Sequence, residues 1–267
     1  MTAAEAIAAA AGLLRAARRA VAFTGAGVST ASGLSDFRSP TGVWAHVDPM
    51  KVASRSAFER QPEEFYAFYR TRLEVLAQAA PNPAHDALAA LERARRLAAV
   101  ITQNVDGLHQ AAGSSTVIEV HGNLREAVCT ACGVVRPIGV IRAALDAEML
   151  PRCADCTGVL KPNVVLFEDL LPMRAWLAAE EAARRSDVML IVGSSLQVYP
   201  AASLPEDTLD AGGRLIIVNR EPTPFDDRAA VTLHGEAAEI LPAIARDVIN
   251  ATKTRERSEG ASSISTE

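Results

Sequence analysis

The residues with the clearest chemistry are four cysteines, which form two Cys-x-x-Cys pairs: Cys129 with Cys132, and Cys153 with Cys156. Each pair makes a tight turn that directs two thiolates to one point, and two such turns complete the tetrahedral S4 shell that suits zinc. Two disulfides would need an oxidising compartment, and a redox Cys-x-x-Cys would explain either pair alone but not the duplication. Because four thiolates leave no open position for a catalytic water, we predict one structural zinc ion and no cysteine free to act as nucleophile.

A second group of residues begins with Gly25 and Gly27, directly after an apolar run. A glycine turn between a strand and a helix can hold phosphate, because the N-terminal amides and the dipole of the helix face the anion. The ordinary dinucleotide fingerprint needs a Gly or Ala where Thr30 stands and an acid at the end of a second strand, whereas Asp48 follows no predicted strand. An Asp-Phe-Arg loop at residues 36–38 offers an aromatic face and a cation instead, so we predict a site that encloses the nucleotide.

Polar residues also follow four other apolar runs. They are Gln103, Asn104 and Asp106, then His121, then Gly193, Ser194 and Ser195, then Asn219, Arg220 and Glu221. Ligands of parallel α/β sheets bind outside the carboxyl ends of the strands, so we expect these residues to converge on one crevice. For His109, in the same region, we expect a helical residue with a local partner.

The runs that must position these residues are short and apolar, and they alternate with helical patterns. They lie at residues 21–24, 99–102, 117–120, 163–167, 187–193 and 214–219. Runs without polar interruptions are typical of strands buried on both faces of a parallel sheet, with helices as the crossovers. We therefore predict an α/β fold with a doubly wound parallel sheet.

Two segments break this alternation, at residues 44–79 and 124–160, and we expect them to form a smaller module inserted into the main domain. The main domain then comprises residues 1–43, 80–123 and 161–250. Residues 251–267 have almost no large apolar side chain, which predicts a disordered tail.

Length and composition favour one α/β domain with a small insertion, because the chain has 267 residues, of which 49% are hydrophobic and 22% charged. The net charge of -5 and the pI of about 5.6 do not indicate that the protein binds nucleic acid or an anionic membrane through its overall charge. Residues 1–20 are rich in Ala, but their arginines follow the apolar stretch, so we predict an amphipathic helix and not a secretory signal. No apolar run approaches the ~20 residues of a membrane span, and we expect a cytoplasmic protein.

The sequence resembles bacterial-type sirtuins, which are NAD-dependent protein lysine deacylases. The motifs that carry the resemblance are, in chain order, GAGVSTASGLSDFRSPTGVW, TQNVDGLH, VIEVHGN, the paired cysteines, GSSLQVYPA and VNRE. The resemblance covers residues 20–245. It implies a Rossmann-type NAD-binding domain, a small domain built from the zinc module and the helical insertion, and acylated lysines of proteins or peptides as substrates. It also implies that NAD is consumed, with nicotinamide and O-acyl-ADP-ribose as products.

The family's motifs assign roles by position. His121 resembles the catalytic general base of a His-Gly motif, and an imidazole can accept a proton near neutral pH. Asn104 would position ribose or water, Asp106 would hold the nicotinamide carboxamide, and Phe37 would shield the reactive face of the ribose. The other residues implied to contact NAD are Gly25, Ala26, Gly27, Ser29, Asp36, Arg38, Trp44, Gln103, Gly193, Ser194, Ser195, Asn219, Arg220, Glu221 and Ala237.

A predicted helix contains Tyr69 and Arg72, which share one face because they are three residues apart. They form either part of an amphipathic stripe with a snorkelling arginine, or a phenol and a guanidinium that bind a carboxylate. The pair resembles the Tyr-x-x-Arg motif of the sirtuin class that removes succinyl, malonyl and glutaryl groups, and Ala53 falls where that class keeps a small residue. The resemblance also places Val164 and Phe167 beside the substrate.

Several residues depart from the pattern of that class. Thr30 and Asp36 are typical of ordinary deacetylases, Ser35 replaces a usual Pro, and Glu168 replaces the Gly of a Phe-Gly-Glu motif. A Glu at this position restricts the backbone and adds negative charge, which favours basic peptides or opposes an acidic acyl chain. We predict deacylation of acidic acyl groups as well as acetyl, with plain deacetylation as the alternative.

Other classes of function make different predictions. An ADP-ribosyltransferase is the nearest alternative, because it breaks the same bond of NAD. A dehydrogenase needs the missing acid after the second strand, and a zinc-bearing nucleic-acid binder conflicts with the net charge. An ADP-ribose reader without turnover conflicts with the presence of His121 and Asn104.

Overall fold

The larger sheet of the computed structural model has six parallel strands in the order β3-β2-β1-β7-β8-β9, as the sequence predicts for a doubly wound fold. The strands are β1 Ala20–Thr24, β2 Val100–Thr102, β3 Val117–Glu119, β7 Val188–Val192, β8 Arg214–Asn219 and β9 Val231–His234. The chain extends the sheet from β1 toward β3 and from β7 toward β9, so the strand order reverses between β1 and β7. Ligands bind at such a switch point. The structure describes residues 1–262, with side chains up to Ala251.

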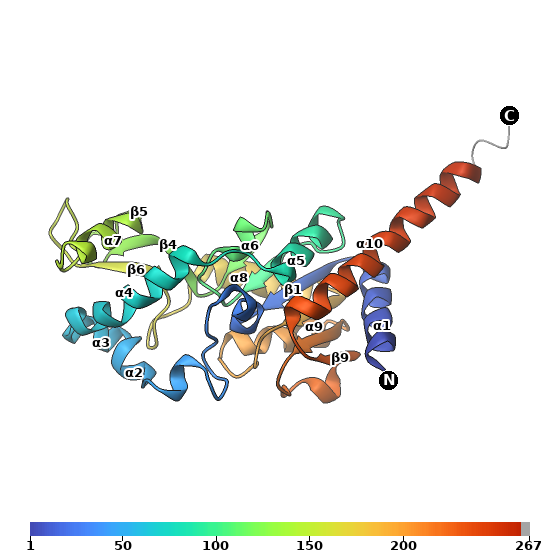
Figure 1. Ribbon diagram of the computed structural model, residues 1–267, viewed down its shortest axis with the longest axis horizontal. Coiled ribbons are helices and arrows are strands. Elements are labelled where there is room, and N and C mark those ends of the chain that lie inside the picture. The colour runs from blue at the N-terminus through green and yellow to red at the C-terminus, as the bar shows by residue number, and fades with distance from the viewer. Residues whose placement is uncertain (263–267) are drawn as a thin grey trace.

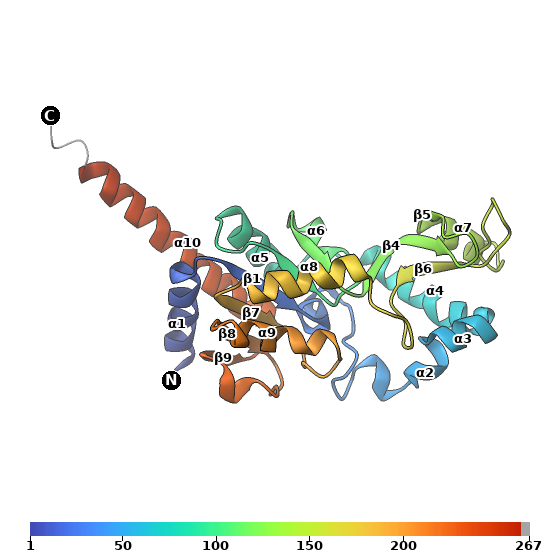
Figure 2. The same cartoon turned by 180° about the vertical axis from the view of Figure 1, so that it is seen from behind.

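Helices cover both faces of this sheet, as Figures 1 and 2 show from opposite sides. They are α1 Ala3–Ala16, α5 Pro83–Arg93 and α10 Ala237–Ser262 on one face, and α8 Met173–Arg184 and α9 Leu204–Asp210 on the other. Within β1, Ala22 belongs to the first apolar core and Phe23 to the second, which is the alternation of a strand buried on both sides. None of the helices in the described part of the chain is long and apolar enough to cross a membrane.

A smaller module lies at the end of the molecule opposite the C-terminal part of α10 (Figure 1). Its antiparallel sheet has the order β5-β4-β6, and four of its helices come from the two segments that break the alternation of the sequence. These elements are α2 Pro49–Val52, α3 Arg55–Arg60, α4 Pro62–Gln78, β4 Gly122–Cys129, β5 Val135–Pro137, α7 Gly139–Asp146 and β6 Leu160–Val164. One apolar core joins both segments, with Phe65 and Tyr66 from α4 against Ile141 and Leu145 from α7.

The remaining short elements follow the main strands or connect the two modules. They are α6 Leu108–Ala111 and the 3₁₀ helices Ala26–Val28, Thr30–Ser32, Val43–Ala45, Ala201–Ser203 and Asp226–Arg228.

One strand prediction differs from the structure, and strands β4, β5 and β9 were not predicted. The apolar run at residues 163–167 is not a strand of the parallel sheet, because β6 ends at Val164 and pairs antiparallel with β4 in the smaller sheet. In β6 the buried Leu160, Pro162 and Val164 alternate with half-buried residues, so the strand period lies earlier in the chain than the apolar run. Strand β9 was not predicted, because it has only four residues at the edge of the sheet, with buried Val231 and Leu233 beside half-buried Thr232 and exposed His234.

Both ends of the described chain are helical. The predicted N-terminal amphipathic helix is confirmed as α1, which begins with a capping box between Thr2 and Glu5. Helix α10 continues to Ser262, within the segment predicted as a disordered tail from residue 251; residues 263–267 lie outside the described residues. The sequence there is rich in Lys, Arg and Glu, which are good helix formers, and extending an existing helix needs no new nucleus.

Candidate active site

A cavity of about 1230 Å³ lies at the carboxyl ends of the parallel strands, between the main sheet and the smaller module. Every residue predicted from the sequence to act in catalysis or to contact nucleotide or substrate lines this cavity. Pockets for one small ligand usually have about 300–1,000 Å³. The volume therefore suits two ligands that meet, and the polar strand ends do converge on one crevice.

The glycine turn is fixed by the close approach of two strand ends. The Gly27 amide donates a hydrogen bond to the Gly193 carbonyl oxygen over 2.8 Å. A Cβ on Gly25 would lie 2.8 Å from that oxygen, and a Cβ on Gly27 would lie 2.7 Å from the Cα of Gly193. Glycine is needed at both positions because a side chain would push apart β1 and β7, between which the strand order reverses.

His121 is held in one tautomer by the backbone. Its Nδ1 lies 3.1 Å from the Gln103 carbonyl oxygen, which can only accept, so Nδ1 carries the proton and Nε2 the lone pair. Burial lowers the pKa of His121, although the hydrogen bond to Gln103 acts in the opposite direction. The imidazole is therefore neutral near pH 7, and Nε2 can accept a proton within the cavity wall.

A hydrogen-bond network centred on the Ser29 hydroxyl orients two more predicted residues. This hydroxyl accepts a hydrogen bond from Asn104 Nδ2 over 3.0 Å and donates one to Asp106 Oδ2 over 2.8 Å. His85 Nε2 lies 3.4 Å from the same hydroxyl and is a donor, because His85 Nδ1 accepts from the Asn82 amide. The amide of Asn104 and the carboxylate of Asp106 are thus fixed relative to each other.

The prediction that His109 pairs locally in its helix is wrong. The ring lies behind the cavity, where Nε2 donates to Thr24 Oγ1 over 2.9 Å, and Thr24 donates to Thr102 Oγ1 over 2.8 Å. Burial lowers the pKa of His109 to about 3, so it stays neutral. Because α6 is short, the side chain reaches between the main strands instead of a neighbour on its helix.

Asp36 shapes the loop that carries Phe37 and Arg38. Its Oδ1 accepts hydrogen bonds from the amides of Arg38 and Ser39, over 3.1 and 2.8 Å. Phe37 then stacks on Trp44, with 5.2 Å between the ring centroids. The carboxylate of Asp36 is occupied by the backbone, so the loop presents an aromatic face and a cation to the cavity, as predicted.

At the far side of the glycine turn, the residues after β8 are held by their neighbours. Arg220 forms an ion pair with Glu236 over 2.6 Å, and Asn219 Nδ2 donates to the carbonyl oxygen of Glu221 over 2.6 Å. Ala237, the first residue of α10, lines the cavity beside them. These contacts fix the loops that the resemblance assigns to the adenosine side.

Tyr69 and Arg72 lie in the wall formed by α4. Tyr69 is 7% exposed, and burial raises its pKa to about 12, so the phenol is neutral. The Arg72 guanidinium lies over the rings of Phe37 and Phe68, 4.9 and 5.6 Å from their centroids. Burial lowers the pKa of Arg72, and no carboxylate among the described residues forms an ion pair with it. A cation without an anionic partner thus lines the cavity.

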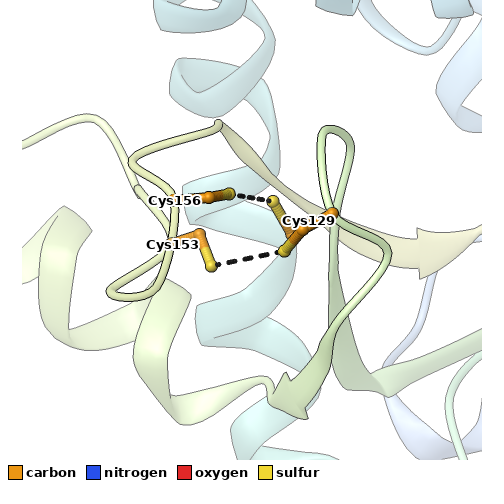
Figure 3. A group of neighbouring side chains, drawn as sticks. Cys129, Cys153 and Cys156 are labelled. Atoms are coloured by element: carbon orange, nitrogen blue, oxygen red, sulfur yellow. Dashed lines mark hydrogen bonds between the residues drawn. The ribbon is translucent and has the colours of Figure 1, made fainter.

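The four cysteines come together as the zinc prediction requires. Their Sγ atoms all lie within 4.8 Å of one another, with 3.4 Å between Cys129 and Cys156 and 3.8 Å between Cys132 and Cys153. Figure 3 shows the side chains of Cys129, Cys153 and Cys156 gathered around one point. Tetrahedral thiolates with Zn–S bonds of about 2.3 Å lie roughly 3.8 Å apart, so these cysteines are positioned to bind a zinc ion. They lie outside the cavity lining, and a zinc ion there would hold the turns next to the smaller sheet.

Comparisons with known proteins agree with this geometry. The profile of the Sir2 family matches residues 25–200. A NAD-dependent protein deacetylase of Caldivirga maquilingensis is 48% identical over 88% of this chain and 91% of its own length. The NAD-dependent protein deacylase 2 of Pyrobaculum aerophilum is 43% identical over 91% of this chain and 96% of its own length. The chain belongs to the Sir2 family.

The likeness of this Sir2-family chain extends to its three-dimensional structure. A solved structure described as Sir2 with a p53 peptide and NAD+ has a TM-score of 0.80 and 41% identity, and the alignment covers 91% of this chain and 97% of that chain. At this identity and coverage, the likeness supports the same architecture throughout the two modules.

Two residues that hold predicted site residues in place were not themselves predicted from the sequence: His85, which contacts Ser29, and Phe68, which contacts Arg72. His85 is the one polar residue on the buried face of α5, where the other buried residues are Ala and Leu. A histidine among apolar residues on one helix face could have indicated a buried hydrogen-bond partner. Phe68 precedes Tyr69 directly, but a single aromatic residue in an amphipathic helix carries no signal of its own.

Proposed function

We propose that this protein is a NAD-dependent protein lysine deacylase, which transfers the acyl group of a modified lysine to ADP-ribose and releases nicotinamide. The observation that carries the proposal is the neutral His121, whose tautomer leaves Nε2 as an acceptor in a cavity with room for two ligands. The names of the relatives, NAD-dependent protein deacetylase and deacylase, support the same activity.

The proposed mechanism uses the residues of the cavity in a set order. When bound, NAD supplies the glycosidic bond to nicotinamide, which breaks as the acyl oxygen of the lysine bonds to the ribose carbon. Asp106 and Asn104, fixed through Ser29, hold the carboxamide and the ribose during this step. Phe37 excludes water from the open face of the ribose. His121 Nε2 then takes the proton of a ribose hydroxyl, which frees that oxygen to attack the acyl carbon. The bond from the acyl carbon to the lysine nitrogen then breaks, the lysine leaves as the protonated amine, and one water molecule adds to complete O-acyl-ADP-ribose.

No cysteine takes part in this mechanism. The four cysteines converge on one another outside the cavity, where they would hold a structural zinc ion, so the substrate itself supplies the nucleophile. His121 is the one histidine among the described residues that line the cavity, so the acid–base role is assigned to it and not to a cysteine.

The acyl preference that we propose includes succinyl and malonyl groups as well as acetyl. Arg72 supports it, because a guanidinium without a carboxylate partner in a cavity wall is matched to a ligand carboxylate, and Tyr69 stands beside it. The carboxylate of Glu168 is bound by Ser56 and does not neutralise Arg72. Plain deacetylation is the second candidate, because the rings of Phe37 and Phe68 already give Arg72 a packing role without any ligand.

The test is NAD-dependent deacylation by the purified protein of one peptide carrying acetyl-lysine, succinyl-lysine or malonyl-lysine. Release of nicotinamide together with unmodified peptide, followed by mass spectrometry, supports the proposal, and its absence from the His121→Ala variant assigns the activity to this cavity. Transfer of label from NAD to protein without any acylated peptide would support an ADP-ribosyltransferase instead. Turnover of the acetyl peptide alone would support the plain deacetylase.

A further inference from the structure

A short backbone ladder joins the loop after β6 to the helical segment before α3. The Phe167 amide donates to the Ala53 carbonyl oxygen over 3.0 Å, and the Arg55 amide donates to the Phe167 carbonyl oxygen over 2.9 Å. Both Ala53 and Phe167 line the cavity, and Phe167 packs edge-on against Trp44. The ladder therefore sets the distance between two sides of the cavity wall beside α4.

Glu168 adds a further connection, made by its side chain. Its Oε2 accepts a hydrogen bond from the Ser56 amide over 2.8 Å, and its Oε1 accepts one from the Ser56 hydroxyl over 3.2 Å. The residue has a φ of 73°, in the region that favours glycine, so its backbone conformation is that expected of a Gly. A glycine would keep the turn without strain, but it could not make these two hydrogen bonds.

The other charged groups near this connection are engaged elsewhere. Asp169 pairs with Lys161 over 2.7 Å and accepts from the Leu166 amide, which fastens the loop back to β6. Arg55 pairs with Glu59 along α3 over 2.9 Å. Among the described contacts, the hydrogen bonds from Ser56 to the Glu168 carboxylate thus connect the loop after β6 to α3. They are separate from the ion pair of Asp169, which connects the same loop to β6.

We propose that Glu168 is a positioning residue that fastens the Phe167 side of the acyl-lysine pocket to the segment from Ala53 to Ser56. This inference rests on the proposed deacylase function. The tie forms the pocket before the substrate arrives, so that binding of the acylated peptide does not have to order the loop. Its loss should therefore raise KM for the peptide, while kcat and KM for NAD change little, because neither the nucleotide turn nor His121 contacts Glu168.

The experiment compares Glu168→Ala and Glu168→Gln in the full-length protein. Glu168→Ala removes both acceptors, and we expect about a tenfold rise in KM for the acylated peptide and at least about tenfold faster hydrogen exchange at the Phe167 and Arg55 amides. Glu168→Gln keeps one acceptor for the Ser56 amide and gains a donor for its hydroxyl, so it should restore both readouts to nearly wild-type values. Glu59→Ala is the control, because it removes a carboxylate from α3 without touching the loop.

Two results would overturn the inference. Unchanged exchange at the Phe167 and Arg55 amides in Glu168→Ala would show that the backbone ladder needs no side-chain tie. Equal damage in Glu168→Gln and Glu168→Ala would assign the effect to the negative charge and not to the hydrogen bonds. If the wild-type protein deacylated no peptide, the proposed function would fail, yet the exchange measurement would still decide whether Glu168 holds the loop.

Discussion

Replacing Arg72 by methionine separates recognition of an acidic acyl group from packing. Methionine keeps an unbranched side chain of similar reach but removes the cation whose pKa is lowered by burial. Loss of one partner of a buried, hydrogen-bonded charge pair costs about 2–5 kcal/mol. At 1.36 kcal/mol per factor of ten, kcat/KM for a succinyl-lysine peptide should fall by roughly 30-fold to 5,000-fold.

The acetyl-lysine peptide should respond differently, because it offers Arg72 no carboxylate. The variant loses contacts to Phe37 and Phe68, worth about 0.5–2 kcal/mol, but no longer has to desolvate a cation, so the two effects offset each other. We expect kcat/KM for acetyl-lysine to change by no more than about threefold. The ratio of the two specificity constants is therefore the quantity to measure.

Arg72→Lys is the matched control for this experiment. It keeps the charge but loses the planar fork, so it should retain part of the succinyl activity that methionine removes. Thermal melting of the variants checks that α4 is intact. If succinyl and acetyl turnover fall by the same factor in Arg72→Met, the guanidinium is only a packing group over Phe37, and the acidic-acyl assignment is refuted.

Three further predictions concern stability and metal content. Gly122→Ala should lower the free energy of unfolding by about 3 kcal/mol or more, because φ is 74° and the new Cβ would lie 2.2 Å from the Asn163 carbonyl oxygen. Gly133→Ala, with φ 73° and open space around the Cβ, should cost only about 1 kcal/mol, and urea unfolding would compare the two; equal losses would contradict the steric argument. The folded-state pKa of His109 lies at about 3, below its unfolded value of 6.5, so its stabilisation is complete above pH 6.5 and falls by about 3 kcal/mol on acidification to pH 4. His109→Gln should remove this part of the pH dependence of unfolding in the same assay, while the part due to His121, whose pKa burial also lowers, remains. Cys132→Ser should reduce the metal content from about one zinc ion per chain and lower the melting temperature, whereas unchanged elemental analysis would exclude the S4 site.

The main sheet could be predicted from the sequence because its strands are buried on both faces. In β1 and β7 every residue is buried, so each gives a continuous apolar run with no competing helical period. The same signal failed at residues 163–167, where an apolar run follows from lining a cavity and not from belonging to the sheet. The edge strand β9 was missed because a half-exposed strand of four residues has too little pattern.

The candidate site could be predicted where side chains act directly, but not where they act through a neighbour. The cysteines carry their chemistry in their spacing, and their convergence is seen in the fold. His109 could not be placed, because its partner Thr24 is distant in the sequence and only strand pairing brings them together. The different partners of two acidic residues could not be predicted from the sequence either. The carboxylate of Asp36 accepts hydrogen bonds from backbone amides, whereas that of Asp106 accepts one from the Ser29 hydroxyl.

One contact joins the two halves of the proposed reaction. Phe37 belongs to the loop that would cover the nucleotide. Its ring stacks on Trp44 and also lies under the guanidinium of Arg72. A carboxylate that draws Arg72 toward itself must weaken or reorient its contact with Phe37, so an acidic acyl group and the nucleotide loop cannot be independent. KM for NAD measured with acetyl and with succinyl peptide should therefore differ in the wild-type protein and become equal in Arg72→Met. An equal KM in the wild-type protein would show that Phe37 holds its position whichever acyl group is bound.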